Sequence, residues 1–213
     1  TMGKFEKGIL GGFNGTIGTV VGATWKGIDY MKSRNRKSGK ARTQAQLEQQ
    51  ARFGLVTRFV STMGKLLMFT FKDSAVKMTG INSAFAYNYE QGLVGAYPTF
   101  SLNYSKVLVS KGQLLNAGNP VATANGNGNL KFDWLDNSGA AMANADDRCI
   151  VVIHCPELNQ TIYNTEAALR SAGTASIAVS NFAGKQVETW VSFASADGSQ
   201  TATSIYTGAV TVS

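Results

Sequence analysis

The strongest constraint on the fold is a change of hydrophobic period after Gly95. From that point, short alternating or apolar segments recur, separated by turn signals such as Asn125-Gly126-Asn127-Gly128 and Asp197-Gly198. Several short strands at this spacing predict an antiparallel β-sandwich or barrel. We expect strands at residues 99–104, 106–110, 129–135, 149–155, 161–163, 176–180, 186–194 and 204–212.

Between Thr43 and Gly95 the apolar residues follow a helical period. Thr43 is placed to cap a helix, and Gln46, three residues later, completes a capping box. A stripe with helical spacing follows, which we interpret as a core-facing surface. A second helix is predicted over residues 74–91. The stripe consists of Leu47, Ala51, Leu55, Phe59, Met63 and Leu66 or Leu67.

The first 34 residues are rich in glycine, with β-forming residues between the glycines. We expect a hairpin arm with strands at residues 16–22 and 24–34 and a turn at Asn14-Gly15. Glycine in a strand allows another backbone to approach closely. Such an arm packs either on the rest of the chain or on a neighbour.

The charge of +7 is unevenly distributed. Residues 1–111 carry 16 Lys and Arg against five Asp and Glu, a net +11, whereas residues 112–213 carry four against eight, a net −4. This asymmetry indicates two modules with different partners. We therefore expect an α+β chain: a basic arm-plus-helix module at 1–111, with two helices, and a sandwich at 112–213.

The positive charge is densest in one segment between the arm and the first helix, which has no acidic residue. Lys and Arg that neutralise phosphates release counterions and bind polyanions in a salt-dependent way. Aromatic residues on the preceding strand are suited to stack on bases, although the same residues are equally suited to pack against the amphipathic helix. The candidate polyanion-binding residues are Lys32, Arg34, Arg36, Lys37, Lys40, Arg42, Trp25 and Tyr30.

Groups that carry catalysis or bind metals are scarce. The one histidine, His154, lies in a predicted strand beside Cys155, and adjacent strand residues point to opposite faces. Cys149 and Cys155 would lie about 20 Å apart along that strand, too far for a disulfide. Asp146-Asp147 lacks the glycine-punctuated loop of a calcium site and is read as a solvated turn. The sequence predicts no catalytic residue, metal or cofactor.

Neither a secretory signal nor a membrane-spanning segment is visible, so we expect a soluble protein that is cytoplasmic or associated with a virion or particle. No small-molecule substrate is evident. The expected partner is another copy of the chain, with nucleic acid as the alternative.

The C-terminal hundred residues resemble a fibronectin type III-like sandwich. Pro120 precedes the first strands, Trp134 stands where that fold has a core tryptophan, and Asp197-Gly198 matches the last hairpin turn. The position of the corner tyrosine is filled by Trp190 or Phe193, which leaves the topology open. Such a fold implies little about activity.

The N-terminal half resembles a family of uncharacterised proteins from Bacteroidota, and that likeness extends over the full chain. The resemblance implies lineage, with no activity to transfer. The glycine-rich arm and basic loop also resemble phage structural proteins by analogy. The matching segments are Met2-Gly3-Lys4, residues 8–13, Gly15, residues 20–22, Trp25-Lys26-Gly27-Ile28-Asp29-Tyr30 and residues 43–47 with Phe53.

Three functions fit these patterns. The first is a non-enzymatic, self-associating structural protein, virion-like or mobile-element-like, in which a basic head docks on an acidic sandwich. The second is a nucleic-acid-binding protein that uses the basic loop at residues 32–42. The third is an adaptor whose sandwich binds a protein or a glycan.

Overall fold

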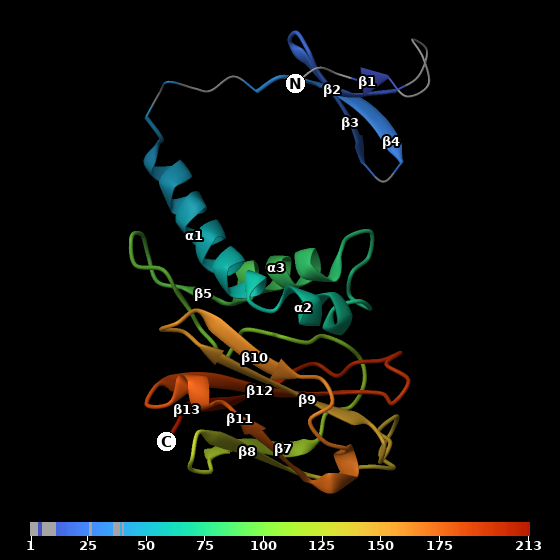
Figure 1. Cartoon of the computed structure of the whole chain (residues 1–213), viewed down its shortest axis with the longest axis vertical. Helices are drawn as coiled ribbons and strands as arrows, with labels where there is room; N and C mark the ends of the chain where they lie inside the picture. The colour runs from blue at the N-terminus through green and yellow to red at the C-terminus, as the bar shows by residue number, and fades with distance from the viewer. Residues whose placement is uncertain (1–3, 6–11, 26, 36–38, 40) are drawn as a thin grey trace. The chain divides into compact units, whose positions relative to one another are not determined.

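The computed structural model describes residues 4–5, 12–25, 27–35, 39 and 41–213, with the backbone alone at Lys4 and Phe5. The chain forms two compact units, Thr1–Thr43 and Gln44–Ser213. Figure 1 labels most of the helices and strands of both.

The N-terminal unit is an antiparallel sheet with strand order β1-β2-β3-β4. An antiparallel arm is confirmed, but the predicted break between residues 22 and 24 is wrong because β3 runs unbroken through Ala23. The predicted turn at Asn14-Gly15 is also wrong because both residues lie inside β2. The chain reverses at Gly18-Thr19 instead, where Gly18 has a φ of +58°. This left-handed conformation favours glycine, so Gly18 sets the turn. The strands are β1 (Lys4–Phe5), β2 (Phe13–Ile17), β3 (Val20–Trp25) and β4 (Ile28–Ser33).

Three helices begin the second unit: α1 (Gln44–Ser61), α2 (Gly64–Thr70) and α3 (Gly80–Gln91). As the capping box predicts, α1 starts directly after Thr43. The expectation of two helices is corrected because the first is interrupted at Thr62-Met63. There the Thr62 hydroxyl donates to the Phe59 carbonyl at 2.7 Å, a local bond that competes with the helical ladder.

The second predicted helix starts six residues later than expected. The Thr79 hydroxyl accepts a hydrogen bond from the Asn82 backbone N–H at 3.3 Å and caps α3 there. Satisfying an otherwise unpaired N–H in this way fixes the start of a helix. A short hairpin follows α3, formed by β5 (Leu93–Val94) and β6 (Ser101–Leu102).

The C-terminal part is a sandwich of two antiparallel sheets. One has the strand order β11-β8-β7 and the other β10-β9-β12-β13. Two short 3₁₀ helices, η1 (Arg170–Ala172) and η2 (Ser180–Phe182), lie in its loops. The strands are β7 (Gly118–Ala124), β8 (Asn129–Leu135), β9 (Arg148–Cys155), β10 (Gln160–Asn164), β11 (Thr174–Ala178), β12 (Gln186–Ala194) and β13 (Ile205–Thr211).

The order of these strands settles the topology. With β7 to β13 taken as strands A to G, an immunoglobulin constant domain would place its fourth strand in the sheet of A, B and E. Here β10 pairs with β9 in the other sheet. This is the arrangement of the fibronectin type III-like sandwich that the sequence predicts.

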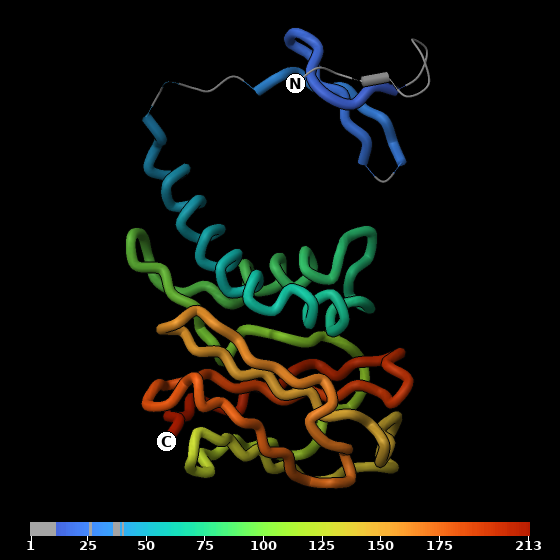
Figure 2. The backbone as a smooth tube through the Cα atoms, in the orientation of Figure 1, coloured from blue at the N-terminus to red at the C-terminus, as the bar shows by residue number. Residues whose placement is uncertain are grey.

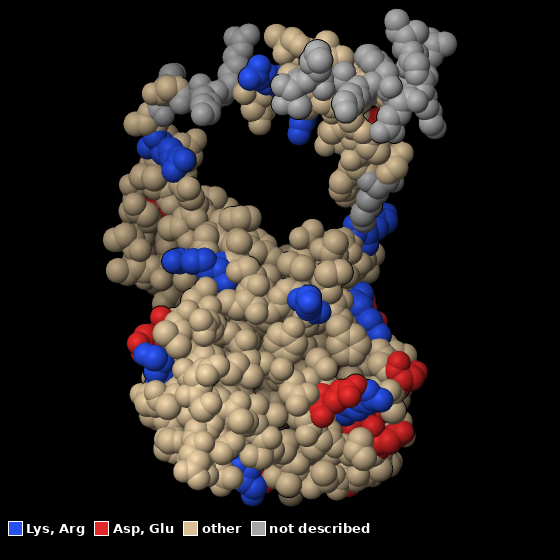
Figure 3. Space-filling model, in the orientation of Figure 1, with Lys and Arg blue, Asp and Glu red and all other residues tan. Residues whose placement is uncertain are grey.

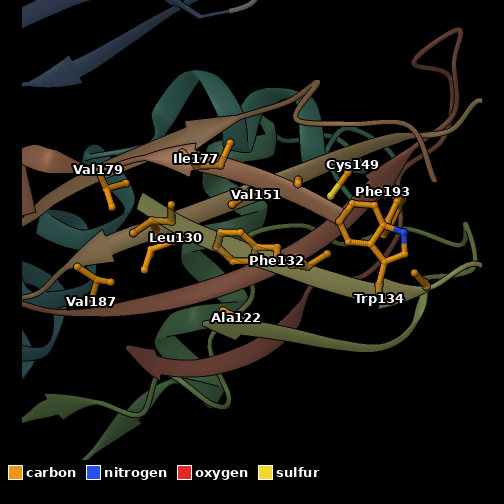
Figure 4. Packing of buried hydrophobic residues seen from close by; sticks show 14 of the residues in the cluster. Ala122, Leu130, Phe132, Trp134, Cys149, Val151, Ile177, Val179, Val187 and Phe193 are labelled. Atoms are coloured by element: carbon orange, nitrogen blue, oxygen red, sulfur yellow. The ribbon is translucent and has the colours of Figure 1, made fainter. Parts of the chain in front are cut away.

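Two cores divide the second unit into three layers (Figures 1 and 2). The first core fills the space between the sheets (Figure 4), and the second lies between the four-stranded sheet and the helices. Successive strand residues point to opposite faces, so β9 sends Cys149, Val151 and Ile153 into the first core and Ile150 and Val152 into the second. Both β9 and β12 are buried on both faces.

The shared second core places the helices and the sandwich in one compact unit. The compact units divide between Thr43 and Gln44, and the expected boundary between residues 111 and 112 lies inside the second of them. The reason is that Phe59 and Leu67 from the helices pack with Trp190 from β12. The C-terminal sheet therefore needs the helices to cover its outer face.

The strand expected at residues 106–110 is absent from the described structure, because side chains rather than a neighbouring strand satisfy this segment. The buried Asn88 amide donates to the Leu108 carbonyl and accepts from the Leu108 N–H, both at 2.9 Å. The Thr70 hydroxyl donates to the Val109 carbonyl at 2.8 Å, and the Ser204 hydroxyl accepts from the Val109 N–H at 3.0 Å.

A buried ion pair organises one end of the sandwich. Arg170 donates through Nε to Oδ2 of Asp147 at 3.0 Å, its Nη2 lies 2.9 Å from the same oxygen, and both side chains are fully buried. Arg170 also donates to the Asn137 side chain and to the Leu115 carbonyl, both at 2.8 Å. The Asp146-Asp147 pair is thus not a simple solvated turn: Asp146 is exposed and Asp147 is buried.

His154 connects the sheet to the helices through a chain of hydroxyl groups. Its Nδ1 lies 2.9 Å from Oγ1 of Thr161, which lies 2.6 Å from Oγ1 of Thr62. Thr62 uses its one hydroxyl proton on the Phe59 carbonyl. Thr161 must then donate to Thr62 and accept from His154, which assigns the neutral Nδ1–H tautomer to His154.

Burial lowers the pKa of His154 from 6.5 to about 4. The unfolded chain therefore binds a proton at a higher pH than the folded chain, and stability is lost as pH falls from 6.5 towards 4. We predict that this site alone lowers the free energy of unfolding by about 2–3 kcal/mol between neutral pH and about pH 4.5.

Urea unfolding of the wild type and of His154→Gln at both pH values measures this loss. Gln keeps a hydrogen-bond donor for Thr161 but does not titrate. Between the two pH values, the free energy of unfolding of the variant should therefore fall less than that of the wild type, by the amount assigned to His154. Equal losses in the two proteins would contradict the prediction.

Candidate interaction surface

The N-terminal sheet has almost no interior. Every buried apolar side chain of the described chain lies between Val56 and Val212, and Gly22 alone is buried among the described residues of the N-terminal unit. Large apolar side chains on this sheet are exposed instead. They are Ile17, Val20, Trp25, Ile28, Tyr30 and Met31.

The register of β3 and β4 distributes these side chains over both faces. Trp25 lies opposite Ile28, and Ala23 lies opposite Tyr30. Opposite residues project to the same side of a sheet, so one face carries Trp25, Ile28, Tyr30 and Lys32. We refer to it as the aromatic face. The other carries Val20 and Met31, which is 71 % exposed.

Glycine is required at the centre of this sheet. A Cβ on Gly22 would lie 2.1 Å from the Phe13 carbonyl oxygen and 2.7 Å from its ring. The Phe13 ring therefore packs over Gly22, the closest approach to a core that the described part of the unit contains. On the same side, the Thr24 hydroxyl donates to the Asp29 carboxylate at 2.5 Å.

The structure brings together part of the predicted polyanion site. Trp25, Tyr30 and Lys32 share the aromatic face, and Nζ of Lys32 lies 5.9 Å from the centroid of the Tyr30 ring. Arg34 follows β4, and its backbone N–H donates to the Thr19 carbonyl at 2.7 Å. Arg42 lies just before α1, away from the sheet in sequence.

Three of the predicted residues, Arg36, Lys37 and Lys40, lie outside the described residues. Four exposed apolar residues of the sheet, Ile17, Val20, Ile28 and Met31, are absent from the predicted site. The signal was present, because apolar residues at both even and odd positions of β4 indicate a strand with two apolar faces.

The parts of the chain differ sharply in net charge. Residues 1–43 carry nine Lys and Arg against two Asp and Glu, a net +7, whereas residues 44–213 carry eleven of each. Within the second unit, residues 44–111 have a net +4 and residues 112–213 a net −4. The whole excess of positive charge therefore lies in the sequence of the N-terminal unit.

Two of the titratable side chains, His154 and Cys149, lie buried in β9. His154 points its Nδ1–H into the hydroxyl chain, and burial raises the pKa of the Cys149 thiol to about 12. Cys149 and Cys155 are free thiols, as expected. In the described part of the chain, no three His, Cys, Asp or Glu side chains are grouped to hold a metal ion.

None of the described helices has the length and apolar character that crossing a bilayer requires.

These features define a class of protein: an α+β chain with a helix-covered, fibronectin type III-like sandwich and a separate N-terminal sheet of exposed apolar residues. The family model of DUF6266, a family of unknown function, matches residues 12–208. The chain belongs to this family. No curated protein and no solved structure matches it.

Proposed function

We propose that this chain is a non-enzymatic structural protein that self-associates through its N-terminal unit, as virion-like or mobile-element-like assembly proteins do. The observation that carries the proposal is a sheet whose described residues form no apolar core and expose apolar side chains on both faces. A small sheet needs a packed apolar face to be stable in water. Another surface must therefore cover it.

A second copy of the chain is the partner that charge favours. The N-terminal unit has a net charge of +7, and the sandwich at residues 112–213 has a net charge of −4. Complementary charge steers association and selects against like-charged surfaces. Each copy thus carries both a basic surface and an acidic region that can bind the basic surface of another copy, which is what self-assembly requires.

The apolar side chains of the sheet supply the affinity. Ile28 is 64 % exposed and Met31 71 % exposed. Burying one such side chain contributes about 1.5–3 kcal/mol. Two apolar residues on the docked face should therefore change the association constant by roughly a hundredfold.

Sedimentation velocity over a roughly hundredfold range of protein concentration tests this proposal. We predict that the full chain associates. Of two variants, one for each face of the sheet, at least one should weaken association by about a hundredfold. The variants are Ile28→Ser with Tyr30→Ser and Val20→Ser with Met31→Ser.

Val76→Ser is the matched control, because Val76 is a 72 % exposed apolar residue of the second unit. Its association should equal that of the wild type. A chain that stays monomeric at the highest concentration would overturn the proposal. So would sheet variants that behave like the Val76 control.

Nucleic-acid binding is the second candidate, favoured by the placement of Trp25, Tyr30 and Lys32 on one face. Such aromatic and cationic side chains stack on bases and neutralise phosphates in single-strand binders. Anisotropy of a labelled single-stranded oligonucleotide should then show affinity that falls at least tenfold between about 50 and 200 mM salt. Tyr30→Ser should weaken binding further, and an unchanged affinity in that variant would reject this candidate.

A further inference from the structure

The end of the sandwich opposite the β9–β10 turn carries two adjoining hollows. One, of about 430 Å³, is lined by Met142, Asn144, Asp146 and Gln200 among others. The second, of about 210 Å³, is lined by Phe69, Arg148 and Glu166. Both hollows share residues 195–197. We refer to Met142, Asn144, Asp146, Glu166, Asp197 and Ser199 as the loop-end surface.

Negative charge is held in place on the loop-end surface. The Asp197 carboxylate accepts a hydrogen bond from the Ser195 hydroxyl at 2.6 Å and from the Ser199 N–H at 2.9 Å. These bonds lower the pKa of Asp197 to about 2, so it is ionised at neutral pH. Asp146 is exposed and forms no ion pair among the described residues.

The distribution of charge on the visible face agrees with this placement. Figure 3 shows Asp and Glu gathered at one side of the sandwich, around an Arg or Lys, in the region where Figure 1 places the loops that precede β9 and β13. The cation of the pair nearest these loops is Arg148, which contacts Glu166. Apolar contact is also available there, because Met142 is 47 % exposed.

We infer that the N-terminal unit of one copy docks on the loop-end surface of a second copy, in a head-to-tail contact. This inference rests on the proposed self-association and names the surface that receives the sheet. Lys32 and Arg34 approach Asp146 and Asp197, and the apolar residues of the sheet cover the side chain of Met142.

Charge disfavours two other partner surfaces that the chain offers. Two N-terminal units, each with a net +7, repel one another. An apolar groove between α1 and α3, lined by Phe53 and Phe85, lies in the helical segment with a net +4. Like charges at such short range oppose association. At the loop end three carboxylates outnumber two cations, Arg148 and Lys72, whose Nζ donates to the Gly198 carbonyl. The loop end therefore has the opposite sign.

A contact between two different surfaces has a consequence for the assembly. Each copy keeps one free sheet and one free loop end after the first contact, so copies add until a ring closes or a filament grows. A closed two-fold dimer does not satisfy this arrangement. Association should also weaken as salt screens the exposed charges.

Charge-reversed variants test the pairing directly. The head variant is Lys32→Glu with Arg34→Glu, and the tail variant is Asp146→Lys with Glu166→Lys. The control, Asp133→Lys with Glu157→Lys, makes the same change of net charge elsewhere on the sandwich. All three replace exposed side chains, and each ion-paired carboxylate that is lost is solvent-exposed.

We expect the head and tail variants to lose association by about tenfold or more when each is alone. An equal mixture of the two should regain it, because the reversed head of one then meets the reversed loop end of the other. The control should associate like the wild type. Thermal unfolding of the second unit checks that each tail and control variant is folded. If the tail variant is not folded, Asp146→Asn with Glu166→Gln takes its place.

The outcomes separate this inference from the proposed function. If the tail variant behaves like the control while the head variant loses association, the loop end is not the acceptor, and self-association stands. If the mixture does not regain association, the head-to-tail pairing is overturned. A wild-type chain that does not associate at all overturns the proposed function itself.

Discussion

The double burial of the four-stranded sheet is the constraint on which the second unit depends. Its two central strands, β9 and β12, send one set of side chains into the sandwich core and the other set under the helices. Neither core can form without the sheet, and the sheet cannot expose either face at low cost, because both are apolar. Helices and sandwich therefore fold as one unit, although the sequence changes character between them.

A buried charge network fixes the position of the loops at the acidic end. Arg170 lies fully buried beneath them and bonds to Asp147, Asn137 and the Leu115 carbonyl. A buried charge keeps its place only where its partners surround it. The exposed Asp146 directly precedes Asp147, which is anchored in the interior, and this gives the loop-end surface a defined shape.

Much of the fold can be predicted from the sequence wherever the local sequence pattern and the tertiary packing favour the same structure. Strands β8 and β12 have the predicted bounds, because alternating or apolar runs end at clear turns. The start of α1 at Gln44 follows from the capping box. Trp134 is buried in the sandwich core, as the resemblance implies, and donates to the Arg170 carbonyl at 2.9 Å.

The sequence-based predictions fail where contacts with residues distant in the sequence determine the local structure. The segment at 106–110 has strand-like residues, but Asn88 and Ser204 satisfy its backbone in place of a strand. Strand β7 was missed because it contains Pro120 and small residues, which an edge strand tolerates. For the candidate site, Trp25, Tyr30 and Lys32 were identified, but only the folded sheet reveals that its described residues form no core beneath them.

The central claim is that the N-terminal sheet is stable only when another copy covers it. Hydrogen exchange of the backbone amides at high and low protein concentration tests this most directly, because exchange reports local opening. The account predicts that amides of β3 and β4 are protected at high concentration and lose protection on dilution, while those of β9 and β12 stay protected at both. Protection of β3 and β4 that is independent of concentration would contradict it.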